Sequence, residues 1–69
     1  MNGTIRVNGK ERPLEAATLA ELLPQMSVDP AGRGIAIALN GEVVPRSAWA
    51  ATALAAGDTV EIVTAFRGG

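Results

Sequence analysis

The side chains that most often carry out catalysis are either absent from this 69-residue chain or scattered along it. The chain has no histidine to act as a general base near neutral pH and no cysteine to act as a nucleophile. A serine nucleophile would need a neighbouring base, and the seven carboxylates form no recognisable pair in the sequence. Without histidine and cysteine, the usual zinc ligands are missing as well. We therefore expect a protein that is not an enzyme by itself and that has no metal site.

Two glycines at the end of the sequence, Gly68 and Gly69, remain as candidates for chemistry. They follow the apolar pattern of a strand, so they would form a short arm that reaches about 13 Å from Phe66 onward. Glycine has no Cβ, so the arm can enter a narrow cleft, and its terminal carboxylate is an anion at neutral pH. This carboxylate could attack the α-phosphate of ATP held by another protein, and the acyl-adenylate could then accept sulfur as a thiocarboxylate. The alternative interpretation is a frayed end without function.

The first half of the chain has the pattern of a hairpin followed by a helix. Apolar residues alternate over residues 4–7, as in a half-buried strand, and Asn8-Gly9 favours a tight hairpin because both turn residues need positive φ. The returning strand at 10–14 contains a proline, so we expect it at a sheet edge. Thr18 and Glu21 have capping-box spacing, in which the Thr18 hydroxyl accepts the Glu21 amide and the Glu21 carboxylate accepts the Thr18 amide.

A short helix is expected after this cap, because three leucines and Met26 fall on one helical face. Pro24 interrupts the pattern, so we expect a short, kinked helix that frays soon after it. After a loop at 27–34, a second hairpin is predicted, with strands at 35–39 and 42–44 and a turn at Asn40-Gly41. A helical turn or two at 47–56 should then cover the core with Trp49. The final strand is predicted at 59–66. This order predicts an α+β fold, in which one main helix packs across a sheet of mixed strand direction.

Composition and charge restrict the kinds of partner. The net charge is −1 and the basic residues are not clustered, which argues against nucleic acid and against anionic membrane surfaces. No apolar run approaches the roughly 20 residues of a membrane span, and the first residues do not resemble a signal peptide. We expect a cytoplasmic protein that is a monomer when free.

Several stretches taken together resemble the ThiS family, the bacterial sulfur carriers of thiamin biosynthesis. These stretches are Thr18–Leu23 (TLAELL), Asn40–Trp49 (NGEVVPRSAW), Leu54, Gly57–Val63 (GDTVEIV) and Gly68-Gly69. The resemblance implies a β-grasp, ubiquitin-like fold, with the domain at residues 1–65 and a flexible tail at residues 66–69.

The resemblance also implies a reaction sequence at Gly69. A ThiF-like adenylating enzyme would use ATP to activate the Gly69 carboxylate, and the carrier itself would bind no cofactor. A sulfur donor protein would then supply the sulfur of the thiocarboxylate. The acceptor would be a ThiG-like thiazole synthase. The tail residues Phe66, Arg67, Gly68 and Gly69 are expected to touch these partners.

A docking face for the activating enzyme is a further expectation. Ala36, Ala38, Val63 and Ala65 could form a flat, weakly polar outer face, and depletion of charge is typical of interface centres. Arg46 and Arg67 could contact an acidic partner surface. The alternatives are ordinary packing for the apolar residues and solvated charge for the arginines.

Other functions remain open on the sequence alone. The chain could be a sulfur carrier for another pathway, such as those of molybdopterin or cysteine. It could also be a non-catalytic β-grasp interaction domain whose tail is inert, or a protein tag like ubiquitin.

Overall fold

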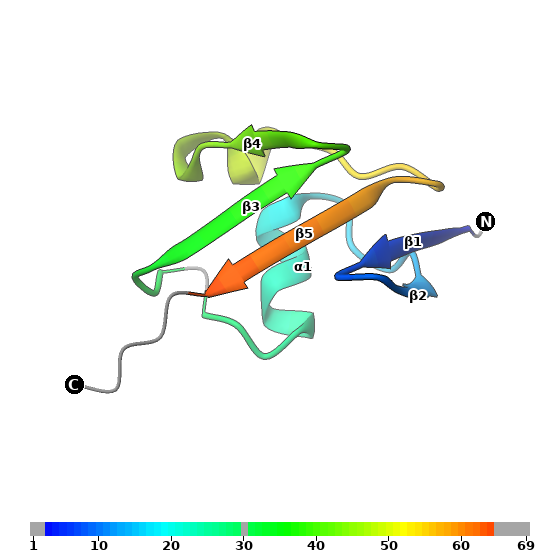
Figure 1. Cartoon of the computed structure of the whole chain (residues 1–69), viewed down its shortest axis with the longest axis horizontal. Helices are drawn as coiled ribbons and strands as arrows, with labels where there is room; N and C mark the ends of the chain where they lie inside the picture. The colour runs from blue at the N-terminus through cyan, green and yellow to red at the C-terminus, as the bar shows by residue number, and fades with distance from the viewer. Residues whose placement is uncertain (1–2, 30, 65–69) are drawn as a thin grey trace.

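The structure, a computed structural model, describes residues 3–29 and 31–64 and contains one five-stranded mixed sheet (Figure 1). The elements are β1 (Thr4–Val7), β2 (Lys10–Pro13), α1 (Leu19–Gln25), β3 (Ile35–Leu39), β4 (Glu42–Val44), the 3-10 helix η1 (Arg46–Ala51) and β5 (Thr59–Thr64). The strands lie in the order β2-β1-β5-β3-β4. Only the β1–β5 pair is parallel among the paired strands described. The predicted α+β fold is confirmed, whereas the predicted boundary between residues 1–65 and 66–69 lies outside the described residues.

Both hairpin turns form where Asn-Gly pairs predicted them. Asn8 and Asn40 each have a φ of 51°, and the following glycines, Gly9 and Gly41, have φ values of 83° and 87°. Positive φ at both turn positions matches the twist of the flanking strands, and asparagine and glycine adopt it most readily. The strand after the first turn, β2, lies at the sheet edge, as its proline required.

The start of α1 confirms half of the predicted capping box. The Glu21 amide donates to the Thr18 hydroxyl at 3.3 Å, as expected. The Glu21 carboxylate, however, accepts from the Ala17 amide at 3.0 Å and not from that of Thr18, so this part of the prediction was wrong. Thr18 pairs with Ala53 in an isolated antiparallel bridge. The bridge joins the chain before the helix to the segment after η1, through bonds from the Leu19 amide to the Thr52 carbonyl and from the Leu54 amide to the Ala17 carbonyl.

Replacing Thr18 by alanine removes the acceptor at the helix start. We expect the free energy of unfolding to fall by about 1 kcal/mol, which is typical for loss of an N-cap. In a domain of this size that corresponds to a melting temperature lower by roughly 4–8 °C. Thermal unfolding followed by circular dichroism measures the change, with Thr18→Ser as the control that keeps a hydroxyl. Equal melting temperatures for Thr18→Ala and Thr18→Ser would contradict the capping role.

The end of α1 is fixed by two backbone hydrogen bonds of the Schellman type. The Ser27 amide donates to the Pro24 carbonyl at 3.0 Å, and the Val28 amide donates to the Leu23 carbonyl at 2.9 Å. Ser27 has a φ of 64°, the left-handed conformation that glycine usually supplies at this position. The half-buried Val28 packs against the core. The helix is short, as predicted, but its C-terminus is capped by these bonds, so the predicted fraying was wrong.

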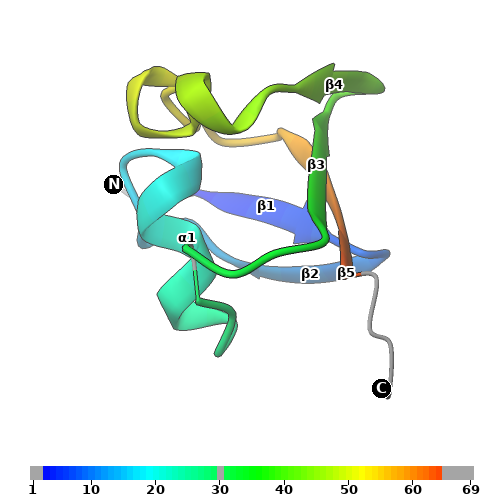
Figure 2. The same cartoon turned by 90° about the vertical axis from the view of Figure 1, so that its left-hand side faces the viewer.

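The core lies between one face of the sheet and the helices. Figure 2 shows α1 and η1 on the same side of the β3–β5 part of the sheet. Three leucines of α1 are at most 1% exposed, and the inward residues of the strands meet them. Trp49 is 3% exposed and donates its indole N–H to the Val44 carbonyl at 2.9 Å, so its predicted role as a core-covering residue is confirmed. The buried set is Ile5, Val7, Ala16, Leu19, Leu22, Leu23, Ile37, Trp49, Leu54, Val60 and Ile62.

Candidate functional site

The predicted site at the end of the chain lies outside the described residues. This applies to Ala65 of the predicted docking face and to the tail residues Phe66, Arg67, Gly68 and Gly69. The structure describes the strand that leads to them, β5, which is the central strand of the sheet. It pairs with β3 from Leu39↔Val60 to Ile35↔Thr64 and with β1 on its other edge. The pairing with β3 thus continues to the last described residue of β5, Thr64, whereas the pairing with β1 covers only Thr59 and Val60.

Three of the predicted docking residues lie together on the sheet. Ala36 pairs with Val63 across β3 and β5, and Ala38 is the next outward-facing residue of β3. Because side chains alternate along a strand, these residues face away from α1, whereas Ile37 and Ile62 face the core. Val63 is 61% exposed although it belongs to the central strand. An exposed valine among small apolar neighbours makes this a surface that a partner could cover.

The structure adds Val43, which sequence reasoning missed. Val43 pairs with Ala38 and is 77% exposed. The Asn40-Gly41 turn could have revealed it, because a two-residue turn places residues 39 and 42 opposite each other and hence residues 38 and 43. We call Ala36, Ala38, Val43 and Val63 the outer-face patch. Glu61, which pairs with Ala38 in β5, places a carboxylate beside it.

Arg46, also predicted for the docking face, comes from a different element. It is the first residue of η1, and its guanidinium carbon lies 4.7 Å from the centre of the Trp49 ring. The same guanidinium donates a hydrogen bond to the Gly32 carbonyl. These contacts connect η1 to the loop before β3. The contacts described for Arg46 are thus with η1 and this loop, and its role in docking stays a prediction.

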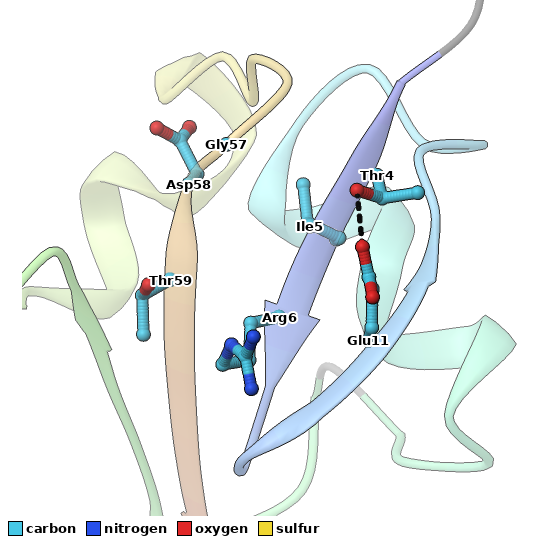
Figure 3. Close-up of a pocket in the computed structure, with 7 residues that line it drawn as sticks. All are labelled: Thr4, Ile5, Arg6, Glu11, Gly57, Asp58 and Thr59. Atoms are coloured by element: carbon cyan, nitrogen blue, oxygen red, sulfur yellow. Dashed lines mark hydrogen bonds between the residues drawn. The ribbon is translucent and has the colours of Figure 1, made fainter.

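A small pocket of about 150 Å³ lies between β1 and the start of β5 (Figure 3). The Thr4 hydroxyl donates to the Glu11 carboxylate at 2.9 Å across its wall. Both carboxylate oxygens of Asp58 accept hydrogen bonds, one from the Asn40 amide group at 3.1 Å and one from the Ala55 amide at 2.8 Å. In the lining, Thr4, Glu11 and Asp58 thus already bond within the chain, and the pocket lies at the opposite end of β5 from Thr64.

The part of the chain that the structure describes has neither a metal-ligand cluster nor a membrane-spanning helix. Over residues 3–29 and 31–64, no three carboxylate, histidine or cysteine side chains gather as metal ligands would. Within the same part of the chain, no helix has the length and apolar character needed to cross a bilayer.

Comparison with known protein sequences gives a consistent result. A family model described as the ThiS family matches residues 5–69. The sulfur carrier protein ThiS of Thermus thermophilus is 40% identical over 63 residues, which cover 91% of this chain and 95% of that protein. A thiazole synthase of Paramagnetospirillum magneticum is 41% identical over 64 residues, which cover 91% of this chain. The chain spans only 19% of the length of that thiazole synthase.

Solved structures agree with the sequence comparison. The crystal structure of the thiamine biosynthesis protein ThiS from Geobacter metallireducens has a TM-score of 0.75 and 36% identity, with all of both chains covered. A solution structure of a thiamine biosynthesis protein from the same organism has a TM-score of 0.76 and 38% identity, and it covers all of this chain and 88% of that one. These neighbours confirm the β-grasp fold that the resemblance implied. The chain therefore belongs to the ThiS family of small sulfur carrier proteins and is a carrier, not a catalyst.

Proposed function

We propose that this chain carries sulfur for thiazole formation in thiamin biosynthesis as a thiocarboxylate on Gly69. The observation that carries the proposal is the sequence end Gly68-Gly69 within a chain that matches the ThiS family over residues 5–69. The chain has no histidine or cysteine of its own, so activation of the carboxylate falls to a partner. That partner is an adenylating enzyme of the ThiF kind, which uses ATP.

The chemistry has two steps at the terminal carboxyl group. A carboxylate oxygen of Gly69 attacks the α-phosphorus of ATP, and pyrophosphate leaves. A sulfur nucleophile at the oxidation level of sulfide, supplied by a sulfur donor protein, then attacks the acyl carbon, and AMP leaves. The product is a thiocarboxylate, whose sulfur can pass to an acceptor. Glycine at the last two positions suits both steps because no side chain shields the acyl carbon.

The proposed acceptor is a ThiG-like thiazole synthase. The support comes from a relative that is itself named a thiazole synthase. It contains a stretch that aligns with 91% of this chain and is 41% identical to it. Two activities that act in succession gain effective concentration when they share one polypeptide. A carrier stretch inside a thiazole synthase is therefore expected if the two work together.

Intact mass spectrometry tests the proposal. The chain is incubated with a ThiF-like enzyme, ATP and a sulfide source, and its mass is then compared with that of the untreated chain. We expect an increase equal to the difference between one sulfur and one oxygen atom, located to the C-terminal peptide. As a control, the same enzyme is shown to convert its own carrier protein. If it does so and the mass of this chain stays unchanged, the proposal is contradicted.

The outer-face patch is proposed as the surface on which the adenylating enzyme docks. A carboxylate at Val63 would place a charge in the centre of that contact without disturbing the core, since Val63 points outward. We expect Val63→Asp to raise the KM for the carrier by roughly tenfold, which corresponds to loss of one interface hot spot. The rate of pyrophosphate release, measured against carrier concentration, gives the KM.

A matched control separates docking from a general effect of charge. Ala50→Asp adds the same carboxylate at an exposed position of η1, away from the outer-face patch. We expect its KM to stay within about twofold of the unchanged chain, since exposed charges contribute little. If Ala50→Asp and Val63→Asp raise the KM equally, the patch is not the docking surface.

A further inference from the structure

The parallel pairing of β1 with β5 ends earlier than β5 does. The paired residues are Arg6↔Thr59 and Val7↔Val60, and β5 continues to Thr64. The last backbone hydrogen bond of this ladder runs from the Asn8 amide to the Val60 carbonyl at 2.9 Å. After it, the backbone turns away, because Asn8 has a φ of 51° as the first residue of the hairpin turn. Beyond Val60, the backbone of β5 on this edge therefore has no strand of β1 to bond to.

The side chain of Asn8 takes the place of the missing backbone. In a parallel ladder, the Ile62 amide would donate to the Asn8 carbonyl, and the Ile62 carbonyl would accept from an amide two residues further on. Instead, the Ile62 amide donates to Asn8 Oδ1 at 2.8 Å, and Asn8 Nδ2 donates to the Ile62 carbonyl at 3.2 Å. The carboxamide thus supplies one acceptor and one donor, as a peptide unit would. It extends the β1–β5 ladder to Ile62, which lies two residues before Thr64.

The second hairpin holds the other end of β5 in a related way. The Asn40 amide donates to the Thr59 carbonyl at 2.7 Å, and the Thr59 amide donates to Asn40 Oδ1 at 2.9 Å. Here too, the side-chain oxygen replaces a backbone carbonyl that the turn has rotated away, since Asn40 also has a φ of 51°. Asn40 therefore fixes the start of β5, and Asn8 fixes its later half. The two asparagines thus share a backbone conformation and a side-chain bond to β5, but they hold different parts of the strand.

We propose that Asn8 is a positioning residue for the carrier reaction. By bonding both polar backbone groups of Ile62, it holds the later half of β5 against the sheet and sets the direction from which the chain continues toward Gly69. A terminal carboxylate can be adenylated only if it reaches the α-phosphate while the domain is docked, so the base of the arm must not shift. The inference rests on the proposed function and adds to it a residue far from Gly69 in the sequence.

Asn8→Gly and Asn40→Gly test the inference as matched variants. Each makes the same change at the same backbone conformation, and glycine adopts a positive φ without strain, so both turns are kept. We expect Asn8→Gly to lower the kcat of carrier-dependent pyrophosphate release by roughly three- to tenfold, with little change in KM, because misplacement of a reacting group reduces the rate and not docking. For Asn40→Gly we expect a kcat within about twofold of the unchanged chain.

Hydrogen exchange on the free chain gives a second measurement that needs no enzyme. We expect the Ile62 and Val63 amides to exchange faster in Asn8→Gly, whereas in Asn40→Gly the faster exchange should be at Thr59. Asn8→Asp is measured beside them: it keeps an acceptor for the Ile62 amide and loses the donor, so its kcat should fall between those of the unchanged chain and Asn8→Gly. Equal exchange at Ile62 and Val63 in the two glycine variants would overturn the inference.

The outcomes also separate this inference from the proposed function. If the unchanged chain is not adenylated at all, both fail together. If it is adenylated and the two glycine variants have the same kcat, the positioning role of Asn8 fails, and the carrier function stands. If only Asn8→Gly loses kcat, both are supported.

Discussion

Deletion of Gly69 is expected to abolish sulfur loading while leaving the folded domain intact. The shortened chain still ends in a carboxylate, but that carboxylate lies one residue, about 3.5 Å, nearer to the domain. Misplacement of a reacting group by as little as about 1 Å can cost roughly 100-fold in rate, so we expect at least that loss here. The described core contains nothing beyond Ile62, and the melting temperature should therefore not change. Intact mass spectrometry after incubation with the adenylating enzyme, ATP and sulfide measures the loading.

Gly69→Ala is the control for this deletion. It keeps the length of the arm and adds one methyl group beside the acyl carbon. We expect it to be loaded more slowly than the unchanged chain and faster than the deletion variant. Loading of the deletion variant at the rate of the unchanged chain would show that the position of the terminal carboxylate does not matter, and the proposed chemistry would then be wrong.

Replacement of Leu22 by alanine is expected to unfold a large fraction of the molecules at 37 °C. Leu22 is 1% exposed and lies on the inward face of α1. Alanine has the higher helix propensity, so the loss comes from packing alone, about 2–5 kcal/mol for a buried leucine. A domain of this size has a net stability on the order of 3–5 kcal/mol. The midpoint of thermal unfolding, followed by circular dichroism, should fall by more than about 10 °C.

Val43→Ala is the matched control, since it also replaces an apolar side chain by alanine. Val43 is 77% exposed at the edge of the sheet, and exposed substitutions usually change stability by less than about 0.5 kcal/mol. A small effect at both positions would mean that α1 does not pack on the sheet as described. A large effect at Val43 would mean that the outer-face patch is already covered in solution, for instance by a second copy of the chain.

Much of the fold could be predicted from the sequence because its signals are local. The strand predicted at residues 35–39 is confirmed, and Ala36, assigned to an outer face, is exposed. Each Asn-Gly pair predicted a hairpin for a conformational reason that involves only the two turn residues. The family could also be identified from motifs, since these combine a loop, a strand and the terminal glycines in one chain.

Sequence spacing did not predict the bonding partners of two side chains. The Glu21 carboxylate bonds to the Ala17 amide, a partner that capping-box spacing alone does not predict. The side chain of Arg46, assigned by sequence to the docking face, lies over Trp49 and bonds to the Gly32 carbonyl.

The sequence by itself determined where strands, turns and the helix begin, which family the chain resembles and which carboxylate could react. Only the tertiary structure decided that Val43 joins the outer-face patch, that Asn40 holds the start of β5 and that Asn8 holds its later half. Asn8 and Ile62 are 54 positions apart, so no local pattern links them. The physical reason is that φ preference and periodicity depend on neighbouring residues, whereas a side-chain amide bonds to whichever backbone groups the completed sheet places beside it.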